Sequence, residues 1–148
     1  MILSSAQTKL EVKQFVKNND SLFNPSLSSR VDLFAYIEKV FKHGLWFGVY
    51  EEGQVGALLG GYANSEIAYI SYLCVATKYQ NNGFANKLIN EFVEYCKSKS
   101  IYSIRLTVKN DSVASDIYLR KGFKKTSEFF YSGTEVKGLE MELIIDEF

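Results

Sequence analysis

Residues 73–88 constrain the fold more than any other part of the chain. An apolar strand pattern ends at Val75, a polar turn occupies residues 80–83, and a long amphipathic helical pattern follows. The first N–H groups of a helix have no intrahelical partners, and the helix dipole places partial positive charge there. A strand, a tight turn and a helix N-terminus in this order therefore predict an anion-binding site. Gly83 lets a ligand approach the backbone because it has no Cβ, and Ala85 keeps the next turn small.

The composition indicates one folded domain spanning residues 1–148. Apolar residues make up 47% of the chain and aromatic residues 15%, enough for a substantial core. The 17 basic and 17 acidic residues cancel, so no broad basic surface for nucleic acid is expected. Cys74 and Cys96 have no zinc-binding or redox spacing, which predicts packed, reduced thiols, and no apolar run is long enough to cross a membrane. We expect a cytoplasmic protein without a metal, a nucleic-acid partner or a membrane span.

Hydrophobic periodicity predicts an α/β domain. Residues 67–75 form a nearly continuous apolar and aromatic run, as in a central strand covered on both faces. A helical stripe follows the glycine turn and consists of Phe84, Leu88, Phe92 and Cys96. Alternation resumes over residues 102–108, so a right-handed crossover should join two parallel strands. The other expected elements are helices at 8–17, 31–42 and after 110–112, and strands at 1–6, 45–50, 55–63, 123–131 and 135–145.

Two motifs at the expected separation resemble those of the GNAT acetyltransferase superfamily. The turn Gln80-x-x-Gly83-x-Ala85 matches the family's coenzyme A pyrophosphate loop at all three fixed positions. A second segment resembles the family's V…N-x-x-A-x-x-L-Y-x-x-x-G-F pattern and consists of Val108, Asn110, Ala114, Ile117, Tyr118, Gly122 and Phe123. One position departs, because Asp111 stands where the family has asparagine and Asn110 precedes it. The element order over essentially the whole chain is also similar to that of the family.

The resemblance implies the GNAT fold, in which a central mixed β-sheet with parallel, splayed strands carries helices on both faces. It implies an acetyl-CoA-dependent N-acetyltransferase that transfers acetyl directly to an amine of a small molecule or a protein. The coenzyme would lie between the strand ending at Val75 and the strand ending at Val108. Tyr118 is the implied catalytic acid, which would protonate the leaving thiolate. The implied coenzyme-binding residues are Leu73, Cys74, Val75, Gln80, Asn81, Asn82, Gly83, Phe84, Ala85, Asn86, Asn110 and Tyr118.

The sequence leaves the general base and the acceptor open. No Asp, Glu or His lies within residues 67–75, and Glu66 stands only at the start of that strand. His43 is better explained as a cation at a helix C-terminus. A water-mediated base, or none, fits this pattern. The acceptor is expected near residues 21–30 and 131–137, where the entrance would be lined by Phe23, Arg30 and Tyr131.

Other hypotheses stand beside N-acetylation. A catalytically silent acyl-CoA-binding or sensor domain would explain the missing carboxylate base, but the presence of Tyr118 argues against it. An interaction domain without coenzyme is disfavoured by the intact turn at residues 80–85. O-acetylation of a sugar is a further alternative, and residues 23–33 resemble bacterial family members associated with surface-polysaccharide gene clusters. The family also suggests a homodimer, for which the C-terminal strands are candidates.

Overall fold

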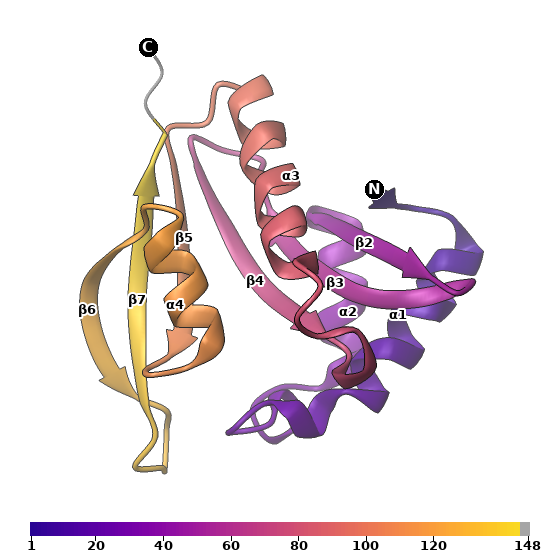
Figure 1. The fold of residues 1–148 in the computed structure, drawn as a ribbon, viewed down its shortest axis with the longest axis horizontal. Coiled ribbons are helices and arrows are strands. Elements are labelled where there is room, and N and C mark those ends of the chain that lie inside the picture. The colour runs from indigo at the N-terminus through magenta and orange to yellow at the C-terminus, as the bar shows by residue number, and fades with distance from the viewer. Residues whose placement is uncertain (146–148) are drawn as a thin grey trace.

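The computed structural model describes residues 1–145 and contains, within them, one seven-stranded sheet and four α-helices (Figure 1). The helices are α1 (Ala6–Asn18), α2 (Leu33–His43), α3 (Phe84–Ser98) and α4 (Val113–Arg120). The strands are β1 (Ile2–Leu3), β2 (Leu45–Glu51), β3 (Gln54–Tyr62), β4 (Ile67–Val75), β5 (Ser103–Lys109), β6 (Lys124–Phe130) and β7 (Lys137–Ile144). Short 3-10 helices are η1 (Asp20–Leu22), η2 (Leu27–Ser29) and η3 (Thr77–Tyr79).

The sheet is mixed, as predicted, and its strand order is β1-β2-β3-β4-β5-β7-β6. β4 and β5 are parallel and are joined through α3, whereas the other neighbouring pairs are antiparallel. The parallel pairing stops after Ile70 on β4 and Leu106 on β5. Beyond this point the two strands diverge (Figure 1). The prediction of parallel, splayed strands is therefore confirmed.

A β-bulge at Ser71 lies where the two strands separate. The register between β3 and β4 shifts between Gly60 and Gly61, which leaves Ser71 as the extra residue on β4. A bulge bends the strand that carries it and increases its twist. The Tyr36 hydroxyl of α2 donates to the Ser71 carbonyl oxygen at 2.9 Å and also contacts the Ser71 hydroxyl. We infer that α2 holds the bend that carries β4 away from β5.

Replacing Tyr36 with phenylalanine should lower stability. The Ser71 carbonyl would lose its side-chain donor, so we expect the free energy of unfolding to fall by about 0.5–1.5 kcal/mol. Tyr62→Phe is the matched control, because the Tyr62 hydroxyl has no hydrogen bond to any part of the chain that the structure describes. Urea denaturation of the two variants measures the difference. Equal stabilities would show that the Tyr36 hydroxyl does not hold the bulge.

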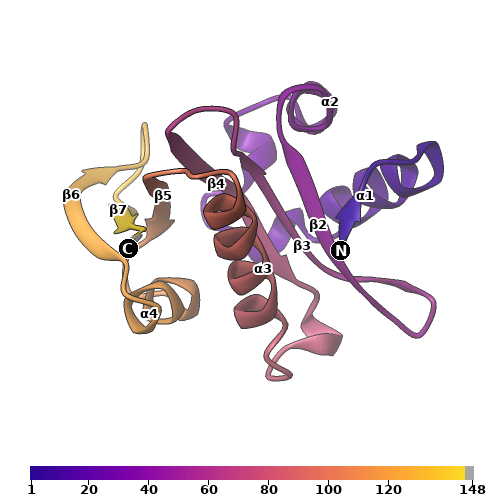
Figure 2. The same ribbon diagram turned by 90° about the horizontal axis from the view of Figure 1, so that it is seen from above.

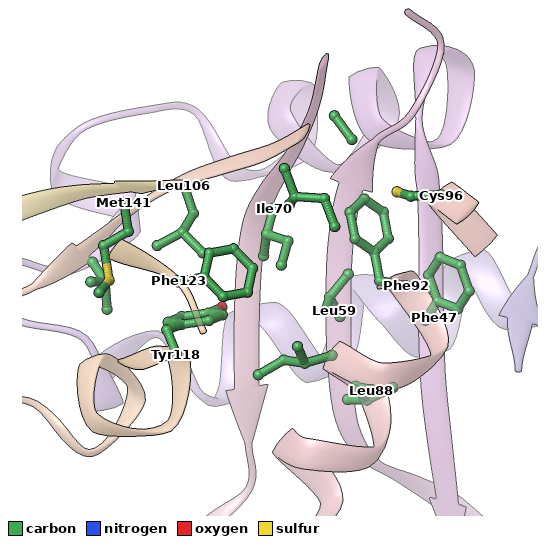
Figure 3. Packing of buried hydrophobic residues seen from close by; sticks show 14 of the residues in the cluster. Phe47, Leu59, Ile70, Leu88, Phe92, Cys96, Leu106, Tyr118, Phe123 and Met141 are labelled. Atoms are coloured by element: carbon green, nitrogen blue, oxygen red, sulfur yellow. The ribbon is translucent and has the colours of Figure 1, made fainter. Parts of the chain in front are cut away.

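Helices cover both faces of the sheet, as predicted (Figure 2), and a hydrophobic cluster packs beneath each pair of helices; Figure 3 shows part of the cluster beneath α3 and α4. α3 and α4 cover one face, and the predicted α3 stripe packs there: the Phe92 ring meets the Phe47 ring edge-on with centroids 5.7 Å apart. α1 and α2 cover the other face around the fully buried Trp46. Both cysteines are buried and free, in agreement with the prediction of packed thiols.

Some element boundaries differ from the sequence-based prediction. The first strand spans two residues rather than six, because Ser5 caps α1 and its hydroxyl accepts from the Thr8 N–H at 3.1 Å. The helix expected after 110–112 does begin there, at Val113, because the Ser112 hydroxyl caps it by accepting from the Ser115 N–H at 3.1 Å. No helix between residues 1 and 145 is long and apolar enough to cross a bilayer. The same residues hold no group of three or more His, Cys, Asp and Glu side chains suited to a metal ion.

Candidate active site

A cavity of about 360 Å³ occupies the gap between the separated ends of β4 and β5. Its walls include Leu73 and Tyr118 from the face covered by α3 and α4, and Tyr72 and Leu27 from the face covered by α1 and α2. The cavity therefore connects the two faces of the sheet. A second hollow of about 640 Å³ adjoins it, and the two share Leu27, Arg30, Ile70, Ser71 and Thr107.

The structure brings six of the predicted coenzyme-binding residues to this cavity. The lining includes Leu73, Cys74, Val75, Gln80, Ala85 and Tyr118. The neighbouring turn and the first turn of α3 carry five more, namely Asn81, Asn82, Gly83, Phe84 and Asn86. These residues lie beside the cavity without lining it. Asn110 does not line the cavity either, although its near neighbours Lys109 and Ser112 do.

The N-terminus of α3 leaves a run of backbone N–H groups available. Gly83 is the N-cap residue with φ of 78°, and no side chain caps the helix. Across residues 1–145, no carbonyl oxygen or side chain accepts from the N–H groups of residues 81–86. A Cβ built on Gly83 would have no neighbouring atom within 4 Å, so the space before these groups is open. Free donors together with the helix dipole form a cradle that fits a phosphate group.

Polar side chains hold the turn against the end of β4. The Gln80 side-chain amide donates to the Val75 carbonyl oxygen at 3.2 Å. The Asn82 amide donates to the Tyr79 carbonyl oxygen at 3.1 Å, and the Tyr79 hydroxyl donates to Glu52 at 2.8 Å. The side-chain amides of Gln80 and Asn82 are therefore engaged within the protein.

Tyr118 projects from α4 into the cavity. Its ring is 3% exposed and packs against the Phe123 ring with centroids 5.2 Å apart. Figure 3 shows the hydroxyl end of the ring directed away from α4 toward β4. Burial raises the pKa of the Tyr118 hydroxyl well above its ordinary value. The group therefore stays protonated at neutral and moderately alkaline pH and is available as a donor.

Cys74 lines the same cavity but is a poor nucleophile. Burial raises the pKa of the Cys74 thiol to about 11, although contact with Tyr72 opposes this shift. Only the thiolate form of cysteine is strongly nucleophilic. The ring of Tyr72 packs between Phe23 and Trp46, with centroid distances of 5.3 and 5.5 Å. These contacts make Tyr72 part of the aromatic packing on the α1–α2 side of the sheet.

The segment that carries Asn110 departs from the family pattern in sequence and turns through a residue with positive φ. Asp111 adopts φ of 57°, and its carboxylate accepts from the Asn110 side-chain amide at 3.3 Å. The cavity wall here is formed instead by Lys109 and Ser112. A contact between Asn110 and the coenzyme stays a prediction without geometric support.

The predicted entrance residues Phe23, Arg30 and Tyr131 all line the cavity. The Arg30 guanidinium lies over the Tyr131 ring, 5.0 Å from its centroid. No Asp, Glu or His of the described chain lines this cavity. Glu66 and His43 both lie outside it.

Several residues of the site carry no signal in the sequence. Ser71 and Thr107 lie in both hollows, and Tyr36 fixes Ser71. Their positions depend on strand register and on the pairing of segments far apart in the chain. A single sequence contains neither piece of information, so these residues were not predicted.

The sequence matches the family described as the acetyltransferase (GNAT) domain over residues 32–145. No curated protein matches the sequence. A ribosomal-protein alanine N-acetyltransferase from Escherichia coli has a TM-score of 0.80 at 14% identity, covering 100% of this chain and 95% of that chain. Ard1 from Thermoplasma volcanium has a TM-score of 0.75 at 21% identity, covering 99% and 98%. An acetyltransferase from Bacillus subtilis in complex with CoA has a TM-score of 0.64 at 14% identity, covering 75% and 83%.

The family match identifies the protein as an acyltransferase, and the splayed mixed sheet with its cavity beside a helix N-terminus has the fold of the acetyltransferases to which it is similar. The chain belongs to the GNAT acetyltransferase family.

Proposed function

We propose that residues 1–148 form one domain that transfers acetyl from acetyl-CoA directly to an amine of a small molecule or a protein. The observation that carries this proposal is the single cavity that joins Tyr118 to the open end of β4, beside the free N–H groups of α3. The GNAT family uses acetyl-CoA, and one structural neighbour is a CoA complex.

The backbone would hold most of the coenzyme. Because pairing between β4 and β5 stops after Ile70, the β5-facing edge of Leu73, Cys74 and Val75 has no strand partner among the described residues. This edge would bind the amide-containing pantetheine arm as an added strand. The Val75 N–H would donate to the acetyl carbonyl oxygen as negative charge develops on it. The N–H groups of residues 81–86 would hold the pyrophosphate.

Tyr118 would supply the proton that the leaving group needs. Attack by a neutral amine forms a C–N bond and breaks the C–S bond of the thioester, and the sulfur leaves with the electron pair. The Tyr118 hydroxyl would donate its proton to this sulfur, the attacking nitrogen would release a proton to water, and the tyrosinate would regain a proton from solvent. The same burial that raises the pKa of Tyr118 also disfavours a free thiolate. The high pKa of the Cys74 thiol supports direct transfer over an acetyl-cysteine intermediate.

The pH dependence of kcat/KM should follow only the deprotonation of the acceptor amine. Below the pKa of that amine, each pH unit raises its neutral fraction about tenfold, so kcat/KM should rise and then level off. Because burial raises the pKa of Tyr118, the acid stays protonated and no decline should appear up to about pH 10. Initial rates between pH 6 and 10, corrected for spontaneous thioester hydrolysis, measure this profile. A decline between pH 8 and 9 would contradict the assignment of Tyr118.

The direct test is acetyl transfer to a panel of amines and amino sugars. The reaction is monitored through the release of free coenzyme A thiol, and the product is identified by its mass. Hydroxylamine treatment then separates the two chemistries, because it cleaves an O-acetyl ester and leaves an amide intact. The proposal expects a hydroxylamine-resistant product. A hydroxylamine-labile product would instead support O-acetylation. The absence of product with all acceptors, from protein that binds acetyl-CoA, would count against transfer to these classes of amine.

A further inference from the structure

Among residues 1–145, Arg30 has no carboxylate partner, and it lies at the junction of the two hollows. It follows η2 and lines both the 360 Å³ cavity and the 640 Å³ hollow. The eight ion pairs within residues 1–145 all use other cations. A guanidinium at this position can therefore meet a ligand without first breaking an ion pair.

Stacking on Tyr131 orients the Arg30 guanidinium. Its central carbon lies 5.0 Å from the centroid of the Tyr131 ring. Such a contact uses the flat face of the guanidinium and leaves N–H groups at its edge free to bind a carboxylate or phosphate in a bidentate manner. Burial raises the pKa of Tyr131, and the positive charge of Arg30 opposes that shift. The positive charge of Arg30 therefore acts on the Tyr131 hydroxyl, which belongs to a residue of the cavity wall.

The charges around the junction favour an anion. The charged residues that line the cavity are Arg30 and Lys109, both cationic. The adjoining hollow is lined by Arg30, Arg105, Glu140 and Glu142, so its charges balance; Glu142 accepts from Arg105 at 3.0 Å, and Glu140 accepts from the neutral Ser127 hydroxyl and keeps its charge. The formal net charge of the chain is zero, so this positive region is a local property of the site.

We infer that the acceptor carries an anionic group, a carboxylate or a phosphate, on the same molecule as its amine, and that Arg30 binds this group. The inference rests on the proposed function and specifies its substrate class. Leu73 and Val75 pack against the cluster beneath α3 and α4, whereas Phe23 packs against the cluster beneath α1 and α2, and Arg30 and Tyr131 line the same cavity. An acceptor anchored at Arg30 would extend its amine toward the thioester and Tyr118. Arg30 would then determine specificity without taking part in the chemistry.

The test uses pairs of amines that differ in the anionic group. Phenylalanine is compared with its amide, and glucosamine 6-phosphate with glucosamine. Binding is measured by calorimetry on the complex with coenzyme A, which cannot react, and kcat/KM is measured with acetyl-CoA and corrected for the neutral fraction of each amine. The variants are Arg30→Ala, Arg30→Lys and the control Arg120→Ala, which alters an exposed arginine of α4 outside both hollows.

A charge-assisted hydrogen bond predicts that the charged member of one pair binds about 10- to 100-fold more tightly. Arg30→Ala should abolish this preference through KM, with kcat and the affinity for coenzyme A unchanged, while Arg120→Ala should retain it. Arg30→Lys should recover more of a phosphate preference than of a carboxylate preference, because lysine lacks the planar fork. A preference within the phenylalanine pair would identify the bound group as a carboxylate, and a preference within the glucosamine pair would identify it as a phosphate.

Three results would overturn the inference. One is equal or absent binding of both charged compounds by protein that binds coenzyme A, and another is a preference that survives Arg30→Ala. The third is weaker coenzyme A binding in Arg30→Ala, which would assign the guanidinium to the coenzyme itself. Failure of the unmodified protein to bind coenzyme A would refute the proposed function, and this inference with it.

Discussion

Tyr118→Phe should lower kcat by about 100- to 10,000-fold, the usual contribution of a positioned general acid. The substitution removes one oxygen atom and keeps the ring that packs against Phe123. The Tyr118 hydroxyl has no hydrogen-bond partner among the described residues, so its removal leaves no group of the protein unsatisfied. We therefore expect unchanged thermal stability and unchanged affinity for acetyl-CoA, with the loss confined to kcat.

The control for this prediction is Tyr102→Phe, because the Tyr102 side chain is 60% exposed and lies outside both hollows. Steady-state kinetics and calorimetry on both variants separate a catalytic role from a binding role. A Tyr118→Phe enzyme with kcat within a few-fold of the unmodified enzyme would exclude Tyr118 as the acid. A loss that falls on KM alone would make it a binding residue.

Gly83→Glu should weaken coenzyme A binding by about 100-fold or more, a loss of roughly 2.8 kcal/mol. The new side chain would start in the open space before the N–H groups of α3 and bring a negative charge to the predicted pyrophosphate site. Like charge and added bulk both oppose a phosphate there. Calorimetric titration with coenzyme A measures the change.

Gly53→Glu is the matched control for the Gly83 variant. The φ angles of the two glycines are similar, 79° for Gly53 and 78° for Gly83. A Cβ on either residue would have no neighbouring atom within 4 Å. Both variants therefore carry a similar cost for a non-glycine residue in the left-handed region, but Gly53 lies in the β2–β3 turn. Unchanged affinity in Gly83→Glu, or equal weakening in both variants, would move the phosphate site away from α3.

Local patterns were sufficient to predict much of the fold. The helical spacing of Leu88, Phe92 and Cys96 predicted α3 and its buried face. The apolar run at residues 67–75 predicted β4 with the bounds that the structure shows. These signals arise from burial along one element, which a sequence records directly. The start of β5 was less certain because Tyr102, expected to alternate with Ile104, is exposed and precedes the strand.

The site was predictable only where its residues form a local motif. The turn at residues 80–85 and Tyr118 belong to such motifs, and both lie at or beside the cavity. The bulge at Ser71 depends on register with β3 and on Tyr36, which is 35 positions earlier in the chain. The position of Asn110 depends on how a short loop closes, and that loop turns through Asp111 with positive φ. No periodicity in the sequence records either arrangement.

Thermal melting of the unmodified protein with acetyl-CoA tests the central claim most directly, since every proposed role depends on coenzyme binding at the open end of β4. Ligand at a hundred times its dissociation constant should add about 2.7 kcal/mol to the free energy of unfolding. For a chain of this size, that gain corresponds to a rise in Tm of roughly 5–10 °C. A rise of this order that increases with acetyl-CoA concentration is the predicted result. An unchanged Tm at millimolar acetyl-CoA, in protein that melts cooperatively, would contradict the account.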